Sequence, residues 1–294
     1  METLAMERKL TIALAQTAAV QTTELSDGVP AACELVRQAA DAGADILCFG
    51  EVFLAPFFPN RLVEDFDHFF LQLPSPITDP IFNAARERGL ALIFPYAEKT
   101  NSAYYNSARV VDGSGAHVGT YRKTHIPAYF PTELAGGTGS FEKFYFTPGE
   151  SLPVFELAGA KIGIQICNDR LYPEPSRVLA RRGAEIIFMP ICYSTYGDVD
   201  HRIGIWDVPL RSRAYENGVW VAAVNRVGTE QPRVHIGRSM FVDPRGSIVR
   251  EAGMQSPELL IETIDLEAVT RQRKKFPWWR DARPDLYDEI VHPV

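Results

Sequence analysis

The chain contains little cysteine and no paired cysteine motif. Its 294 residues include four cysteines, and none belongs to a CxxC pair. Cys48, Cys167 and Cys192 each lie in or beside an apolar run, which is typical of reduced thiols rather than of a disulfide framework. This usage predicts a cytoplasmic protein.

Long hydrophobic runs and an excess of positive charge are also absent. No segment approaches the roughly 18 unbroken apolar residues of a membrane span, and Thr11, Gln16 and Thr17 interrupt the one stretch that resembles a signal peptide. The 30 basic residues are outnumbered by 37 acidic ones, giving a formal net charge of −7. Because nucleic-acid binding requires a basic patch or stripe, we expect neither a membrane nor a nucleic acid as partner.

Several catalytic signatures are missing as well. The sequence has no HExxH, GxSxG, Walker-type or GxGxxG motif. These motifs mark zinc peptidases, serine hydrolases of the α/β type and nucleotide-binding proteins, so the sequence gives no support to those classes.

What remains is an ordinary globular composition, with 46% hydrophobic and 23% charged residues. Short apolar runs alternate with helical patterns, and no repeat or linker-like shift divides the chain. The patterns predict helices at residues 27–42, 79–89, 173–183, 205–217 and 265–275. They predict strands at residues 9–16, 45–49, 90–98, 105–112, 116–121, 152–157, 160–167, 184–193, 219–225, 237–243, 247–251 and 259–265. We therefore expect one α/β domain spanning residues 1–294, with sheets covered by helices.

Three reactive side chains lie at or just past the ends of expected strands: Glu51, Lys123 and Cys167. Active groups of α/β sheets gather at such ends. A carboxylate, an ammonium and a thiol would together supply a base, a positive charge and a nucleophile. Taken singly, Cys167 also fits a small core residue, Glu51 an ordinary strand-end carboxylate and Lys123 a solvated basic residue beside Arg122. Spacing alone does not bring the three together.

The strings around these residues are more specific. GEVFLAPFFP (50–59), YRKTHIP (121–127) and ICNDRLYPE (166–174) resemble, in the same order, the three catalytic motifs of the nitrilase superfamily of carbon–nitrogen hydrolases. The resemblance extends through residues 210–228 and 239–249, and thus over nearly the whole chain. Within the superfamily the sequence is most similar to N-carbamoyl-D-amino acid hydrolases and ureidopropionase-type carbamoylases, on account of CNDR, of FFP and of residues 142–149.

The resemblance implies a fold and a mechanism. The fold would be a four-layer αββα sandwich. Cys167 would be the nucleophile, Glu51 the general base, and Lys123 the cation that stabilises the oxyanion, with the backbone N–H of Asn168 as second donor. Glu142 would position Lys123 or the substrate, although on residue type alone it could be a solvated carboxylate beside Lys143. No metal or organic cofactor would be required.

The resemblance also bears on the small-molecule substrate. Arg170 would bind a substrate carboxylate or, alternatively, pair internally with Asp169 or Glu174. His125 would line the pocket or make a structural hydrogen bond. Leu171 stands where the carbamoylase pattern has a second arginine, and Cys192 and Tyr193 replace an Asn–Thr pair. These departures predict a more apolar pocket and weaken the assignment to D-amino acids.

The expected activity is cleavage of an N-carbamoyl compound with release of ammonia and carbon dioxide. The alternatives are an aliphatic or ω-type amidase, a nitrilase, which Asn168 and Asp169 disfavour, and a catalytically silent scaffold. Residues 128–141 are expected to cover the site as a glycine-hinged lid. The aromatic tail, residues 274–294, is expected to contact another subunit in a homodimer or homotetramer.

Overall fold

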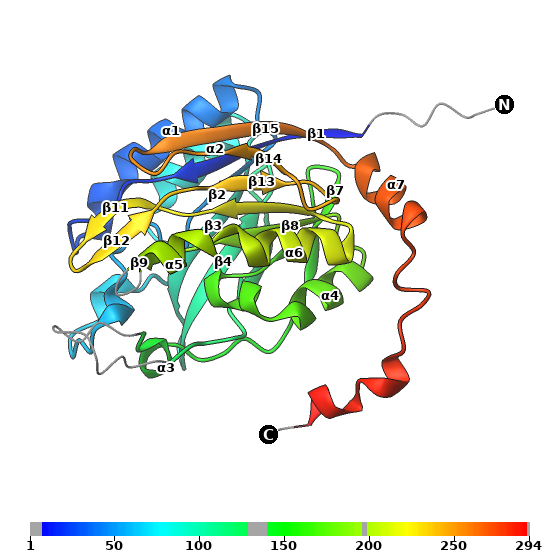
Figure 1. Cartoon of the computed structure of the whole chain (residues 1–294). Helices are drawn as coiled ribbons and strands as arrows, with labels where there is room; N and C mark the ends of the chain where they lie inside the picture. Colours follow the sequence, from blue (N-terminus) through cyan, green and yellow to red (C-terminus); the bar gives the residue numbers. More distant parts are fainter. Residues whose placement is uncertain (1–7, 129–139, 196–198, 293–294) are drawn as a thin grey trace.

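Two six-stranded sheets form the centre of the protein, seen in a computed structural model that describes residues 8–128, 140–195 and 199–292 (Figure 1). In the first sheet the strands run in the order β15 (Glu258–Asp265), β1 (Lys9–Gln16), β2 (Ile46–Phe49), β3 (Ala91–Lys99), β4 (Tyr104–Val111) and β5 (His117–Arg122). In the second they run β14 (Ile248–Glu251), β13 (Met240–Val242), β10 (Trp220–Val224), β8 (Ile186–Pro190), β7 (Ala160–Ile164) and β6 (Val154–Leu157). The central strands of each sheet are parallel, so their carboxyl ends share one edge.

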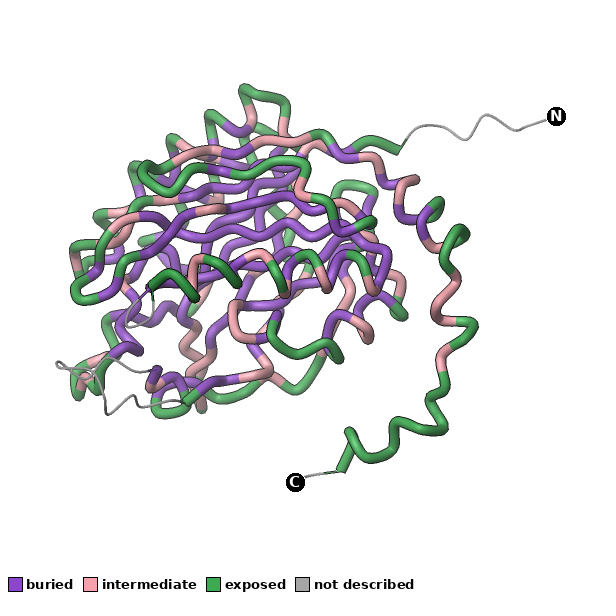
Figure 2. Tube along the Cα trace, in the orientation of Figure 1, coloured by how far each residue is buried: buried purple, intermediate pink, exposed green. Residues whose placement is uncertain are grey.

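The central strands β2, β8 and β10 are apolar and buried on both faces, so each sheet packs against the other sheet on one side and against helices on the other. Ile46 and Cys48 of β2 face the second sheet, where they share one buried cluster with Ile186 and Phe188 of β8. In Figure 2 the tube along the central strands of both sheets is coloured mostly as buried.

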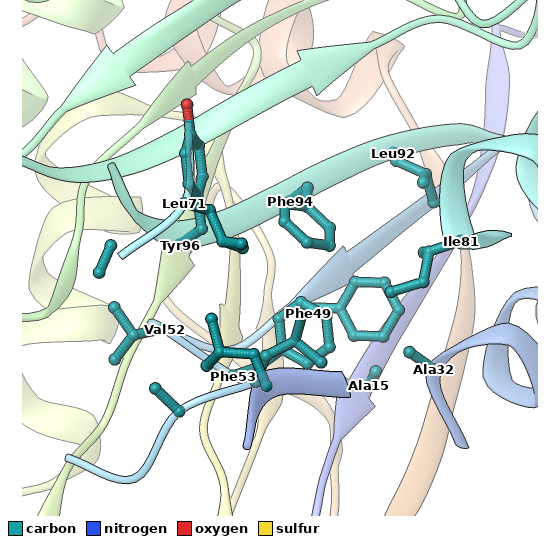
Figure 3. Close-up of a cluster of buried hydrophobic side chains, with 14 of the residues drawn as sticks. Ala15, Ala32, Phe49, Val52, Phe53, Leu71, Ile81, Leu92, Phe94 and Tyr96 are labelled. Atoms are coloured by element: carbon teal, nitrogen blue, oxygen red, sulfur yellow. The ribbon is translucent and has the colours of Figure 1, made fainter. Parts of the chain in front are cut away.

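Helices cover the outer faces. α1 (Val29–Asp41) and α2 (Asp79–Glu87) pack on the first sheet, where Phe49, Phe94 and Ile81 belong to a cluster rich in aromatic rings (Figure 3). α4 (Pro173–Arg181) and α6 (Asp207–Asn217) pack on the second sheet. α6 ends at Asn217 and is capped by Gly218, whose φ of 56° is the left-handed conformation that commonly ends a helix. The order helix, sheet, sheet, helix confirms the predicted four-layer αββα sandwich.

Some elements differ from the sequence-based expectation. A third sheet, β11 (Val227–Glu230), β12 (Arg233–Ile236) and β9 (Ser194–Thr195), was not predicted, and neither were the short helices α3 (Glu142–Tyr145) and α5 (Val199–Gly204). The strand expected at residues 160–167 ends at Ile164, because Cys167 already opens a 3-10 turn, Cys167–Leu171. The strand expected at residues 237–243 keeps only Met240–Val242.

After α7 (Glu267–Lys275) the chain leaves the body as an extended, largely exposed arm (Figures 1 and 2). The expected lid, residues 128–141, falls almost entirely outside the described residues. No helix in the described part of the chain is long and apolar enough to cross a membrane.

Candidate active site

Three charged side chains form a buried cluster where β2 and β5 end. Lys123 Nζ donates to Glu51 Oε1 at 2.9 Å and to Glu142 Oε2 at 2.5 Å. Lys123 and Glu51 are both 0% exposed, and Glu142 is 2% exposed. Charges are this deeply buried in proteins only when they are paired. The structure therefore brings the predicted base, cation and second glutamate into direct contact.

The two carboxylate oxygens of Glu51 differ in their hydrogen bonding. Asn106 Nδ2 donates to Glu51 Oε1 at 2.7 Å, so this oxygen accepts from both Asn106 and Lys123. Oε2 is buried and has no hydrogen-bond partner among the described residues. A buried carboxylate oxygen without a partner is costly in a structural role but useful as a proton acceptor.

Cys167 lies at the start of its 3-10 turn, after the end of β7. Its φ of 46° is in the left-handed region, which non-glycine residues rarely adopt and which is concentrated at functional sites. The side chain of the half-buried Cys167 lines a cavity of about 450 Å³ together with Glu142, Asn168 and Arg170.

The cluster sets the protonation states around the thiol. Burial, reinforced by the Glu51 carboxylate, raises the pKa of Cys167 to about 12, against the opposing influence of Lys123 and Arg170. Burial alone would lower the pKa of Lys123, but Glu142 and Glu51 raise it well above its usual value. Burial also raises the pKa of Glu142, a rise that Lys123 opposes. At neutral pH the site therefore contains a neutral thiol beside a permanent ammonium.

Asp169 ties the nucleophile turn to the segment that carries Lys123. Its carboxylate accepts from Tyr121 Oη at 2.7 Å and from the backbone N–H groups of Ile166 at 2.8 Å and His125 at 2.9 Å. Tyr121 is two residues before Lys123, and Ile166 directly precedes Cys167. Asp169 thus connects the two chain segments. Both of its carboxylate oxygens already accept hydrogen bonds from these segments, and neither binds Arg170.

Arg170 points its guanidinium at the nucleophile. Nη1 donates to the carbonyl of Cys167 at 2.6 Å and lies 3.7 Å from its Sγ. The guanidinium also lies over the rings of Tyr193, at 5.1 Å, and Trp206, at 5.6 Å. Arg170 is 4% exposed, its Nε has no partner, and it forms no ion pair within the described chain. The alternative prediction, an internal ion pair of Arg170 with Asp169 or Glu174, is therefore wrong.

The other predicted substrate contacts fall into two groups. Asn168, Cys192 and Tyr193 line the same cavity as Cys167. His125 lies outside its described lining: the ring stacks on Tyr172 at 4.2 Å, and Nδ1 lies 3.0 Å from Asp169 Oδ1. The structure thus supports the structural hydrogen bond rather than the lining role for His125.

Sequence reasoning assigned no site role to Asn106, Arg202 or Arg233, and it favoured a packing or interface role for Trp206. Asn106 is a buried polar residue of β4, but this strand also contains Arg109 and the buried Ser107, so its sequence gave no clear signal for Asn106. Arg202, Trp206 and Arg233 line the cavity, but only the tertiary fold brings them there. Among the described residues no group of three or more His, Cys, Asp or Glu side chains is arranged to hold a metal ion.

Comparison with known proteins agrees with this architecture. A family model for carbon–nitrogen hydrolases matches residues 11–274. An N-carbamoylputrescine amidase of Solanum lycopersicum is 34% identical, over 97% of this chain and 95% of the relative. A citrullinase of Francisella tularensis is also 34% identical, over 74% of this chain and 76% of the relative. The crystal structure of a carbon–nitrogen hydrolase from Helicobacter pylori G27 superposes with a TM-score of 0.86 at 26% identity, covering 98% of this chain and all of that one, 100%.

The four-layer fold with its cysteine-lined cavity defines a nitrilase-type enzyme, a class that hydrolyses carbon–nitrogen bonds other than peptide bonds. More particularly, the chain belongs to the carbon–nitrogen hydrolase family.

Proposed function

We propose that this protein is a cysteine amidohydrolase that cleaves an N-carbamoyl compound bearing a carboxylate. The observation that carries the proposal is the unpartnered oxygen Oε2 of Glu51, buried in a cluster beside Cys167 and Lys123. A base with a free oxygen, a fixed ammonium and a thiol that they both influence suit attack on a carbonyl carbon.

In the first half of the reaction Glu51 takes the proton of the Cys167 thiol as Sγ bonds to the carbamoyl carbon. Lys123 and the backbone N–H of Asn168 stabilise the negative charge that develops on the carbonyl oxygen. Glu51 returns the proton to the terminal nitrogen, the C–N bond breaks, and ammonia leaves. Because the Cys167 pKa is raised to about 12, proton removal accompanies attack instead of preceding it.

In the second half Glu51 takes a proton from water, whose oxygen attacks the thiocarbamate carbon. The C–S bond then breaks, and the sulfur regains its proton from Glu51. The released carbamic acid loses carbon dioxide and leaves the free amine. One carboxylate thus serves as base and acid twice, and Glu142 keeps Lys123 in place.

The charge of the cavity favours a substrate with a carboxylate. Arg170 is buried beside Cys167 without a carboxylate partner, and a guanidinium binds a carboxylate through two parallel hydrogen bonds. The described lining also contains Arg202 and Arg233. N-carbamoylputrescine carries a free ammonium, so the guanidinium of Arg170 disfavours the compound for which the Solanum lycopersicum relative is named.

A simple amidase is the second candidate. Phe57, Trp206 and Ile205 contribute apolar surface to the cavity, and Leu171, where the carbamoylase pattern has an arginine, is 54% exposed at its rim. An aliphatic carboxamide would suit such walls. Arg170 then would have no substrate group to bind, and for this reason the carbamoyl substrate is preferred.

The test is ammonia release from a panel by the wild type, Cys167→Ala and Arg170→Gln. The panel contains N-carbamoyl-D- and L-amino acids, N-carbamoyl-β-alanine, N-carbamoylputrescine, simple amides and one nitrile. We expect Cys167-dependent release from the carboxylated carbamoyl compounds and a KM at least about tenfold higher in Arg170→Gln, as loss of a charged hydrogen bond implies. Ammonia release from neutral or cationic compounds alone would refute the claim that the substrate bears a carboxylate. Ammonia release by Cys167→Ala would refute the claim that Cys167 is the nucleophile.

A further inference from the structure

A guanidinium from the second sheet holds the backbone that follows Glu51. Arg226, just past the end of β10, is 0% exposed. Its Nη2 donates to the carbonyls of Glu51 at 2.8 Å and Val52 at 3.1 Å, and its Nη1 donates to that of Ala55 at 3.0 Å. Three carbonyls of one turn therefore converge on a single side chain.

Glu230 completes this arrangement from the third sheet. Arg226 Nη1 also donates to Glu230 Oε1 at 2.6 Å, and Glu230 Oε2 accepts from the backbone N–H of Phe57 at 2.7 Å. The pair thus contacts the turn of residues 51–57 at both ends, at Glu51 and at the cavity-lining Phe57.

The turn needs such support because its backbone is strained. Val52 has a φ of 41°, which is strongly disfavoured for a β-branched residue. Its side chain is fixed in the aromatic cluster beside Leu71 and Phe53, so the residue is held from both its side chain and its carbonyl (Figure 3). Strain of this kind persists only where the surroundings over-determine it.

We infer that Arg226 and Glu230 are positioning residues that fix the turn of residues 51–57, and thereby hold the Glu51 carboxylate where it acts on Cys167. This inference rests on the proposed role of Glu51 as the base. Neither Arg226 nor Glu230 belongs to the described lining of the cavity. Their loss should therefore act on the chemical step and leave substrate binding largely intact.

The test is Arg226→Lys, which keeps a positive charge opposite Glu230 but cannot present a planar fork to three carbonyls at once. We expect kcat to fall at least about tenfold with KM within about twofold, because small displacements of a catalytic group are costly. We also expect iodoacetamide to alkylate Cys167 at least about fivefold more slowly, a readout that needs no substrate. Both are measured well below the unfolding transition seen by circular dichroism.

Arg273→Lys is the matched control. Arg273 also donates to a backbone carbonyl, that of Ala184 at 2.8 Å, but it lies on α7, outside the described cavity lining. It should lower the melting temperature without changing kcat or the alkylation rate. Equal losses of kcat in Arg226→Lys and Arg273→Lys would overturn the inference, since general destabilisation would then explain both.

Glu230→Gln provides a second variant should Arg226→Lys fail to fold. It keeps the size of the side chain and removes its charge, and we expect a smaller loss of kcat in the same direction. If the wild type is active and the folded variants Arg226→Lys and Glu230→Gln keep its kcat and its alkylation rate, the positioning role is refuted while the proposed function stands. A wild type that releases ammonia from no panel compound would instead refute the proposed function, and the alkylation rates would still test the positioning role.

Discussion

The groups around Cys167 determine the protonation state of its thiol. Burial, reinforced by the Glu51 carboxylate, raises the pKa of Cys167 and keeps the proton on sulfur, although Lys123 and Arg170 act in the opposite direction. A cysteine with this balance is a weak nucleophile until a base removes its proton. Glu51 provides that base. Asn106 and Lys123 hold its Oε1 by hydrogen bonds, while its Oε2 has no partner among the described residues and can accept the proton.

This balance predicts the pH dependence of Cys167 alkylation. A group with a raised pKa stays protonated below that value, so the thiolate fraction should grow throughout the range from pH 7 to pH 10. We expect the rate with iodoacetamide, followed by peptide mass spectrometry, to rise continuously without a plateau. A plateau below about pH 8 would mean a preformed thiolate and would contradict the account. Cys48, buried and likewise raised in pKa, is the internal control and should remain nearly unreactive.

At the scale of elements, the site depends on how strand ends are tied together. β7 and β5 belong to different sheets, and the carboxylate of Asp169 connects the turn after one to the residues around the end of the other. The strain at Cys167 needs this support in the same way that the strain at Val52 needs Arg226.

Asp169→Asn should weaken that connection. The amide keeps one acceptor oxygen but offers an N–H where Asp169 now accepts several hydrogen bonds. We expect kcat to fall about tenfold or more and the free energy of unfolding to fall by about 1–3 kcal/mol, measured by urea denaturation. Glu174→Gln, an exposed change in the next helix, is the control and should alter neither quantity. A fully active Asp169→Asn would contradict the positioning role.

Sequence patterns predicted the strands of the two main sheets because apolar runs such as residues 45–49 and 184–193 are stable only when buried, whereas the four-layer arrangement came from the family resemblance. The motif strings likewise identified Glu51, Lys123 and Cys167. The third sheet was missed because β9 has only two residues, and because β11 (VGTE) and β12 (RVHI) mix polar and apolar residues without an apolar run. Arg226 and Asn106 were missed because the groups that they hold, the carbonyls of residues 51–55 and the carboxylate of Glu51, lie far away in the sequence, and only the fold brings them together.

At the scale of the whole molecule, the arm after α7 packs little against the sandwich and is largely exposed to solvent. Trp278 still contacts Tyr215 of α6, with ring centroids 4.9 Å apart, but Leu286, Ile290 and Val291 are 64%, 64% and 71% exposed. Large apolar side chains in such a row are typical of an interaction surface. We propose that residues 274–294 contact a second copy of the chain.

The arm can be tested by sedimentation equilibrium. The full chain should sediment as a dimer or tetramer, and Leu286→Asp with Ile290→Asp should lower the apparent mass by burying charge at the contact. Asp288→Asn, an exposed change in the same segment, should leave the mass unchanged. A monomeric wild type, or a double variant with the wild-type mass, would contradict this proposal.

The central claim is that Cys167 forms a covalent intermediate as ammonia leaves. The most direct measurement is rapid acid quenching of wild type turning over a carboxylated N-carbamoyl compound, followed by mass spectrometry of the peptide that contains Cys167. The account predicts an adduct on Cys167 with the mass of the substrate less ammonia, absent from Cys167→Ala. Turnover with no adduct on Cys167, or ammonia release at an undiminished rate by Cys167→Ala, would contradict it.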